Sequence, residues 1–213
     1  SGWSWGMPTS HLEKAFKDAG DTLRLRYTIL KDGATYVPGD PTWNADNPYI
    51  VSASKHKSGR CNMKLYIPVA KRPDPYDAPH IPLNYRLLRY ADVLLMYAEV
   101  ENALGNDSEA QWALNQVRHR AKLADVTSTG KELRDAIRLE RRLELAMECG
   151  RFFDLVRWGI ADQVMNKYYG SEKNRRSYLN DAYFTKNKNE YCPIPQKQIN
   201  YSKGIYVQNC GWE

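Results

Sequence analysis

The sequence predicts a mostly α-helical protein built on antiparallel helix pairs, in the manner of tetratricopeptide repeats. Between residues 84 and 159, apolar residues recur at spacings of three and four, which is the period of an amphipathic helix. Short polar turns divide this stretch into three segments, and a short turn makes consecutive helices antiparallel. From residue 31 to residue 82, prolines, glycines and aromatic residues replace any regular period. This second stretch predicts a long, irregular, aromatic-rich excursion from the helices.

The first thirty residues open with a tryptophan-rich loop, after which Ser10 can cap a short helix over His11–Ala19. Residues 23–30 (LRLRYTIL) alternate apolar and basic side chains, which predicts a strand and leaves room for one short β-hairpin. Ser4 lies in Gly-Trp-Ser-Trp-Gly, the formal pattern of a hydrolase nucleophile. That pattern needs a strand before it and a helix after it, and Pro8 follows almost at once. We therefore predict no catalysis by Ser4.

The excursion over residues 31–82 is rich in turn formers, but its tyrosines and its tryptophan argue against disorder. A long ordered loop on a rigid helical base is a common way to build a binding face. Sugars present apolar C–H faces and hydroxyl groups, so a sugar site needs aromatic platforms beside amide groups. For each loop aromatic taken singly, packing is the alternative role. The predicted ligand-binding residues are Trp3, Trp5, Tyr36, Trp43, Asn44 and Tyr49.

Three amphipathic helices are predicted between residues 84 and 150, each with a start or stop signal. Gly105 ends the first in a Gly-Asn-Asp-Ser turn, and Gly150 follows the third as a left-handed C-cap. The second and third begin with pairs spaced as capping boxes, which are Ser108 with Gln111 and Thr129 with Glu132. The apolar positions predicted to line the core face of the first helix are Leu87, Leu88, Ala91, Leu94, Leu95, Ala98 and Leu104.

A further helix is predicted over Ile160–Tyr169, after a corner in which Asp154 and Arg157 pack and hydrogen-bond. The two tryptophans in helical context, Trp112 and Trp158, are predicted to lie in the core. From residue 171 the chain is polar and irregular.

Three glutamates, Glu140, Glu144 and Glu148, recur every four residues along one face of the third helix. A glycosidase needs two carboxylates that face each other across a cleft, whereas these three share a face. We therefore predict a salt-bridging network, at the surface or between helices, and no enzyme activity. The arginines expected to hold the carboxylates ionised are Arg138, Arg141, Arg142 and Arg151.

The formal net charge of +6 invites a nucleic-acid partner. However, most helical cations alternate with glutamates, and the one uncompensated basic stretch, residues 167–176, has no RNP-type strand or KH-type loop. We predict no nucleic-acid partner. The four histidines have no metal-ligand spacing, and no phosphate loop or dinucleotide fingerprint is present, so we predict no metal and no cofactor.

Four cysteines, Cys61, Cys149, Cys192 and Cys210, are too far apart for a zinc knuckle or a CxxC redox site. In an oxidising compartment they allow three disulfide pairings, of which Cys192 with Cys210 is preferred because the two flank the tail. The alternative is four unlinked thiols, with Cys149 buried at the end of its helix.

Several motifs in a fixed order go beyond periodicity. Residues 89–95 (RYADVLL), 97–99 (YAE), 114–118 (LNQVR) and 150–155 (GRFFDL) resemble the SusD/RagB family. Members of this family are surface lipoproteins of Gram-negative gut and oral bacteria that capture glycans. In the tail, Pro193-Ile194-Pro195 and Gln208-Asn209-Cys210-Gly211 resemble the family's PIP and QNPG signatures, with Cys210 in place of the usual proline. The resemblance covers residues 80–213, and the first 30 more loosely.

The resemblance implies a SusD-like fold and a non-catalytic, cell-surface glycan-binding protein that delivers its ligand to a SusC-like TonB-dependent transporter. It implies attachment to the outer membrane only through a lipid anchor, which this chain does not show. Because members of the family are usually more than twice as long, residues 1–213 are expected to be the C-terminal portion of one SusD-like domain. Its predicted parts are a loop-rich part (1–83), a helical core (84–170) and an irregular tail (171–213).

The alternative function is that of a helical-repeat scaffold that docks the transporter, with ligand binding elsewhere or with a peptide as the ligand. Exposure of Trp3, Trp5 and Trp43 on a common face would distinguish a glycan-binding protein from such a scaffold.

Overall fold

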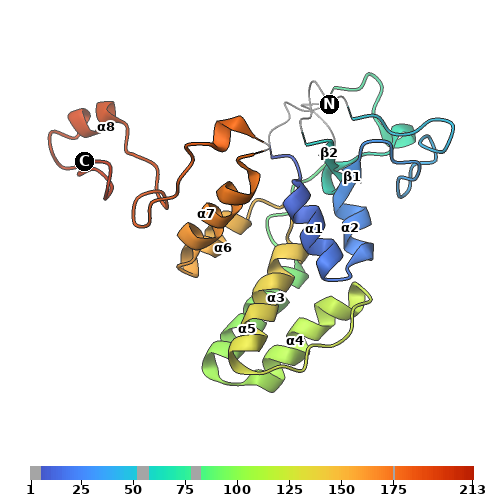
Figure 1. Cartoon of the computed structure of the whole chain (residues 1–213), viewed down its shortest axis with the longest axis horizontal. Coiled ribbons are helices and arrows are strands. Elements are labelled where there is room, and N and C mark those ends of the chain that lie inside the picture. The colour runs from blue at the N-terminus through green and yellow to red at the C-terminus, as the bar shows by residue number, and fades with distance from the viewer. Residues whose placement is uncertain (1–5, 52–57, 78–82, 175) are drawn as a thin grey trace. The chain divides into compact units, whose positions relative to one another are not determined.

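The computed structural model describes residues 6–51, 58–77, 83–174 and 176–213. The chain divides into two compact units, Ser1–Cys149 and Gly150–Glu213. The predicted fold class is confirmed, because helices dominate both units and the described residues form one sheet of two short strands (Figure 1). The boundary between the units falls within the stretch 84–170 that we predicted to be a helical core.

The helical base of the first unit consists of α3 (Tyr90–Leu104), α4 (Asp107–Arg120) and α5 (Gly130–Glu144), which lie side by side (Figure 1). As predicted, α3 ends at Gly105, which has a left-handed backbone with φ 85°. The short turn after it sends α4 back along α3. The buried residues that the three helices share are Leu94, Leu95, Ala98, Ala110, Ala113, Leu114, Val117, Leu133 and Ile137.

The first of these helices begins later than predicted, at Tyr90 rather than near residue 84. Arg89 before it has an extended backbone, and its guanidinium bonds to Glu144 and Glu148, which holds this segment out of the helix. The predicted apolar face is wrong at three positions, of which two lie in this segment and one is the last residue of α3. The leucines that are exposed rather than buried are Leu87, Leu88 and Leu104.

The two predicted capping boxes are also wrong. The residues before α4 and α5, Asn106 and Thr129, make no side-chain cap hydrogen bond. Gln111 instead donates from Nε2 to the carbonyl oxygen of Ser128 at 2.9 Å, so it fastens the loop between the two helices. Trp112 on α4 was predicted to be core but is 51 % exposed, with its ring edge-on to Tyr97.

The third helix ends at Glu144, before the predicted glycine cap. Met147 and Cys149 adopt positive φ values of 65° and 62° in the turn that follows. Gly150 has φ −84° and is the N-cap of the next helix, so its predicted role as a left-handed C-cap is wrong. Cys149 is exposed rather than buried.

Two short helices precede the sheet. The predicted helix near the N-terminus is confirmed as α1 (Ser10–Asp18), although Thr9 caps it rather than Ser10, accepting from the Leu12 N–H at 3.1 Å. The predicted strand over residues 23–30 is wrong, because α2 (Thr22–Thr28) occupies most of it. The Asp21 carboxylate accepts from the backbone N–H of Arg24, which starts a helix that the alternating pattern did not reveal.

Only the end of that segment is a strand, β1 (Ile29–Lys31), which pairs antiparallel with β2 (Arg60–Asn62). The two strands lie about thirty residues apart and therefore form no tight hairpin. Between and after them runs the predicted irregular excursion, which includes the short helices η1 (Met63–Leu65) and η2 (Val69–Lys71). The side chains that pack β1 against α1 and the end of α5 are Phe16, Ile29, Leu143 and Ala146.

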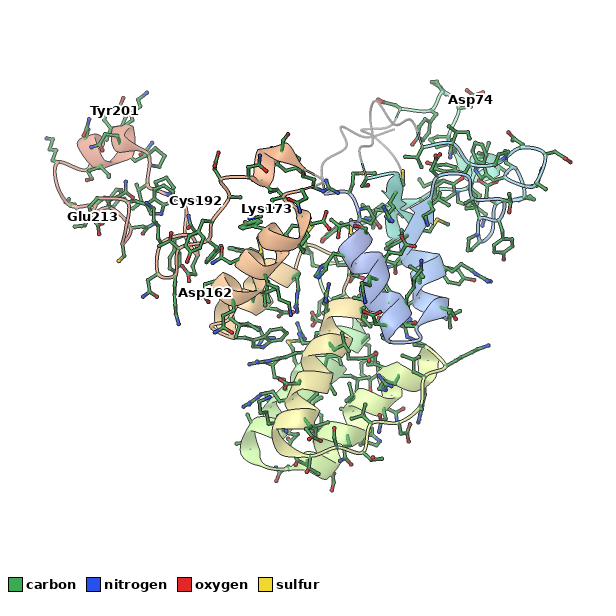
Figure 2. All side chains as sticks on the ribbon, viewed as in Figure 1. Asp74, Asp162, Lys173, Cys192, Tyr201 and Glu213 are labelled. Carbon is green, nitrogen blue, oxygen red and sulfur yellow. The ribbon has the colours of Figure 1, made fainter. Side chains whose placement is uncertain are left out.

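The second unit begins with α6 (Arg151–Arg157) and α7 (Ala161–Glu172). Figure 2 labels Asp162, in the first turn of α7, and Lys173, the residue directly after it. The predicted corner is confirmed, since Arg157 and Asp154 form an ion pair with an N–O distance of 2.9 Å. A small cluster of Leu155, Ala161 and Phe184 is buried here, and Trp158 packs half-buried against it.

The tail contains η4 (Ser177–Leu179) and α8 (Gln196–Tyr201) and is otherwise irregular (Figure 1). Its two signature motifs meet. Gln208 Oε1 accepts from the Ile194 N–H at 2.7 Å, and Gln208 Nε2 donates back to the Ile194 carbonyl at 2.9 Å. Cys192, labelled in Figure 2, and Cys210 both carry free thiols, so the preferred disulfide is not formed in this structure.

In the parts of the chain that the structure describes, no helix has the length and apolarity needed to cross a membrane.

Candidate functional site

An aromatic cluster anchors the excursion. The rings of Trp43 and Tyr49 meet edge-to-face with centroids 5.0 Å apart, and Tyr66 packs edge-to-face on Tyr49 at 6.3 Å. Trp43 Nε1 donates to the Tyr66 hydroxyl oxygen at 2.7 Å. Beneath these rings lie the buried side chains of Leu30, Val37 and Met63. The excursion is therefore ordered by a core of its own.

The same cluster is tied to a buried carboxylate. Asp40, 2 % exposed, accepts from the Tyr66 hydroxyl at 2.5 Å, from the Val69 N–H at 2.8 Å and from the Thr42 N–H at 3.1 Å. Burial by itself raises the pKa of Asp40, but these hydrogen bonds outweigh it and lower that pKa from 3.8 to about 2. Burial and the neighbouring carboxylate raise the pKa of Tyr66. Asp40 therefore acts as an ionised acceptor that joins two parts of the excursion, the turn at Thr42 and the segment from Tyr66 to Val69.

The predicted ligand-binding residues fall into different environments. Tyr36 is 62 % exposed, with the Arg26 guanidinium carbon 5.3 Å from its ring centroid. Asn44 is exposed, and its Oδ1 accepts from two backbone N–H groups, so its oxygen closes a turn. Trp43 and Tyr49 are half-buried in the cluster. Two further predicted residues, Trp3 and Trp5, and with them Ser4, lie outside the described residues.

Glu140, Glu144 and Glu148 form the predicted ionic network, and it runs between helices, although Glu148 lies in the turn after α5 rather than on the predicted helix face. Glu140 and Glu144 are buried. Arg24 on α2 approaches both, at 2.6 and 3.1 Å, and Glu148 pairs with Lys64 at 2.6 Å. The other arginines that bond to these glutamates are Arg89, Arg118 and Arg120. These partners come from elements distant in sequence, whereas the neighbouring Arg141 and Arg142 contact Asp92 and His11.

A cavity of about 370 Å³ opens beside this network within the first unit. Its walls are α2, η1, the segment 83–86 that leads into α3, and the ends of α4 and α5. Tyr27 and Tyr85 line it, both with exposed rings, and the Tyr85 hydroxyl donates to the Glu148 carbonyl at 2.9 Å. Its lining is thus partly aromatic and partly cationic.

The electrostatics of the cavity wall follow from its pairings. Burial raises the pKa of Glu144, but hydrogen bonds and charges of the surrounding arginines prevail and lower it. Burial lowers the pKa of Arg89, yet its contacts with Glu148 and Glu144 raise it overall. Lys64 has a lowered pKa because burial outweighs its bond to Glu148. Glu144 and Arg89 are therefore held in their charged forms.

The sequence did not point to this cavity, because its wall is assembled from residues as far apart as Arg24 and Glu144, which are 120 positions apart. One local signal was present in the sequence, namely Asn-Tyr-Arg at residues 84–86, shortly before α3.

Other candidate chemistry gains no support. Among the described residues, no cluster of histidine, cysteine and acidic side chains is arranged to hold a metal ion. In the basic stretch 167–176, Arg176 pairs with Glu172 at 3.3 Å and contacts the Tyr178 hydroxyl.

Comparison with known proteins gives one consistent family. The SusD family matches residues 5–212. SusD-like protein P38 of Formosa agariphila is 41 % identical over 102 residues, which are 43 % of this chain and 20 % of that protein. The chain therefore spans a small part of the curated relatives that it matches.

Solved structures agree with this assignment. A laminarin-binding SusD-like protein superposes with a TM-score of 0.69 and 28 % identity, over 99 % of this chain and 39 % of that protein. Surface glycan-binding protein A of Bacteroides thetaiotaomicron superposes with a TM-score of 0.64 and 26 % identity, over 93 % and 40 % of the two chains.

Proposed function

The chain belongs to the SusD family, and from this premise we propose that it is a non-catalytic protein that binds glycans. The observation that carries the proposal is the excursion between β1 and α3, an irregular aromatic segment with its own core. Such a segment holds exposed rings on a fixed base, which is what recognition of sugar C–H faces requires. Two solved relatives that are named as laminarin-binding and glycan-binding support the same function.

We further propose that the protein acts at the cell surface, on the outer membrane, and passes its ligand to a SusC-like TonB-dependent transporter. Membership of the family supports this step. In this proposal residues 1–213 supply the C-terminal portion of one SusD-like domain, with a loop-rich part that contacts ligand and a helical part that supports it.

Tyr36 is the best residue for testing the ligand site, because its ring is exposed and Trp43 and Tyr49 also hold the excursion together. Native affinity electrophoresis through gels that contain a panel of polysaccharides gives the readout. We expect one or more polysaccharides to retard the chain, and Tyr36→Ala to weaken that retardation. The matched control is Tyr183→Ala, which removes a tyrosine of similar or greater exposure from the second unit.

Circular dichroism of each variant shows whether the helices are intact. Loss of retardation in both tyrosine variants would point to a non-specific aromatic effect. An absence of retardation by every polysaccharide, with intact helices, would refute glycan binding by this chain.

The second candidate is a helical scaffold that docks the transporter, with the ligand bound elsewhere or with a peptide as the ligand. It is favoured by the outer face of α3, where Val93, Met96, Tyr97 and Val100 are exposed. Pull-down of a SusC-like transporter by the wild-type chain but not by Val100→Lys, in the absence of any polysaccharide binding, would favour this candidate over the first.

A further inference from the structure

The cavity of the first unit has an unbalanced charge. The ionisable groups on its wall and in the network directly behind it are six cations and four carboxylates. The cations are Arg24, Lys64, Arg86, Arg89, Arg118 and Arg120, and the carboxylates are Asp21, Glu140, Glu144 and Glu148. At this site the cations therefore outnumber the carboxylates by two.

Two arginines that line the cavity have N–H donors without a hydrogen-bond acceptor among the described residues. Arg24 is 8 % exposed and lines the cavity, and its Nη2 has no hydrogen-bond acceptor among the described residues. Arg86 is exposed on the cavity wall, and no hydrogen bond or ion pair joins it to the parts of the chain that the structure describes. Guanidinium groups bind planar or tetrahedral anions through paired N–H donors. Arg24 Nη2 is itself buried, so it is the exposed Arg86 on the cavity wall that offers unsatisfied donors of the kind that an anion requires.

The uncharged part of the cavity wall has the aromatic and amide groups that bind sugars. Tyr27 and Tyr85 contribute exposed rings, and Asn84 contributes an amide beside them. The volume of about 370 Å³ lies at the small end of ligand pockets, which span about 300–1,000 Å³. That size suits one or two sugar residues rather than a long chain.

We propose that this cavity binds the charged residue of an acidic glycan, with Arg86 at its wall contacting the carboxylate or sulfate group and Tyr27 and Tyr85 contacting the ring. The inference rests on the proposed glycan-binding function and adds to it the chemical class of one sugar. A uronate and a sulfated sugar share the anionic group that the arginines recognise.

Isothermal titration calorimetry on the whole chain tests this proposal with three matched ligands: a hexuronate disaccharide, a sulfated disaccharide and a neutral disaccharide. We expect at least one acidic ligand to bind and Arg86→Gln to weaken that binding by about tenfold, as expected for a lost charge-assisted hydrogen bond. Arg134→Gln removes the same charge from the exposed face of α5 and should leave the affinity unchanged. Because no described residue forms a hydrogen bond or an ion pair with Arg86, its variant should fold normally.

The outcomes separate the two proposals. Selective binding of one acidic ligand identifies the anion as a carboxylate or a sulfate and supports the inference. Equal affinities in Arg86→Gln and Arg134→Gln would overturn it. Inorganic sulfate is titrated as a fourth ligand, and an affinity equal to that of the acidic disaccharide would also overturn the inference, since no sugar would then be recognised. Binding of the neutral ligand alone would overturn the acidic site but would still support glycan binding. If no ligand binds and no polysaccharide gel retards the chain, both the acidic site and the proposed glycan-binding function are refuted.

Discussion

Among single residues, Asp40 has the clearest energetic role, because one buried carboxylate serves three donors from the excursion. In Asp40→Asn, one oxygen becomes an NH₂ group that cannot accept from these donors. We expect the variant to be less stable by about 1–3 kcal/mol, the usual cost of leaving a buried group unsatisfied. Urea denaturation followed by tryptophan fluorescence measures the difference, since Trp43 lies in the same cluster.

The pH dependence of that difference follows from the lowered pKa of Asp40, about 2 against 3.8. A carboxyl with a depressed pKa in the folded state stabilises the protein above its unfolded pKa and loses that contribution as pH falls through the folded value. The stability gap between wild type and Asp40→Asn should therefore be full above about pH 5 and shrink between about pH 4 and pH 2. A gap that stays constant over this range would contradict the ionised form of Asp40.

Trp43 and Tyr36 should respond differently to the same kind of truncation. Trp43 packs on Tyr49 and donates to Tyr66, so Trp43→Ala should cost about 2–4 kcal/mol of stability. Replacing the exposed Tyr36 by alanine should lower the free energy of unfolding by about 0.5 kcal/mol or less. Paired urea denaturation curves measure both values, and similar losses in the two variants would mean that Tyr36 is also structural.

These two residues show what the sequence can say about a site. The sequence showed the aromatic content of the excursion, and from this content we predicted that the excursion is ordered. The exposure of each ring was not, because it depends on which side chains meet Leu30 and Met63, and these lie more than thirty positions apart. The predicted binding role of Tyr36, Trp43, Asn44 and Tyr49 therefore stays a prediction, to be tested by binding experiments.

Among the elements, α5 is fixed to its neighbours by charge as well as by apolar packing. Glu144 is buried and bonds to Arg24 of α2, to Arg89 before α3 and to Arg120 of α4. Glu144→Gln leaves the buried Arg24 and the partly buried Arg89 with less compensation, and breaking a buried ion pair costs about 3–5 kcal/mol. We expect a loss of about 3 kcal/mol in urea denaturation.

Glu132→Gln, an exposed substitution in the first turn of the same helix, is the control and should change stability by about 0.5 kcal/mol or less. The arginines lower the pKa of Glu144 despite its burial, so its contribution should also fade as pH drops below its ordinary value of 4.5. Equal effects of the two substitutions would show that the network carries little net energy.

The outer face of α3 presents apolar side chains that the described residues leave uncovered. Val93, Met96, Val100 and Leu104 recur at helical spacing and are all exposed. Contiguous apolar surface of this kind promotes association. We expect the chain to self-associate with rising concentration and Val100→Lys to reduce that association without lowering the unfolding midpoint. Sedimentation velocity over a range of concentrations measures this, and unchanged association in the variant would place the contact elsewhere.

Element types were largely predictable and element ends were not. Helix periodicity identified α3, α4 and α5, because their shared core repeats every three or four residues. The failures have tertiary causes. Residues 84–89 read as helix but are drawn out by the ion pairs of Arg89, and α2 read as a strand because apolar and basic residues alternate over only eight positions. Long-range charge contacts decide the first case, whereas in the second the Asp21 cap starts the helix and Arg24 of that helix pairs with the distant Glu140 and Glu144.

At the scale of the whole chain, the two compact units differ in how many apolar side chains they bury. Among the described residues, the first unit contains the large helical core and two smaller clusters, whereas the second has one small cluster around Leu155, Ala161 and Phe184. Conformational entropy must be offset locally by buried surface. The units should therefore differ in local stability even though one family profile covers both.

Hydrogen exchange measured by mass spectrometry tests this difference. Amides of α4 around Leu114, which is fully buried, should exchange slowest, since only opening of the whole helical core exposes them. Amides in the tail after α8, where Ile205, Tyr206 and Val207 are exposed, should exchange at least about a hundredfold faster. If a polysaccharide that retards the chain also slows exchange in the excursion but not in the tail, the ligand binds in the first unit. Tail amides as protected as those of α4 would mean that the second unit is stabilised by contacts beyond its own small core.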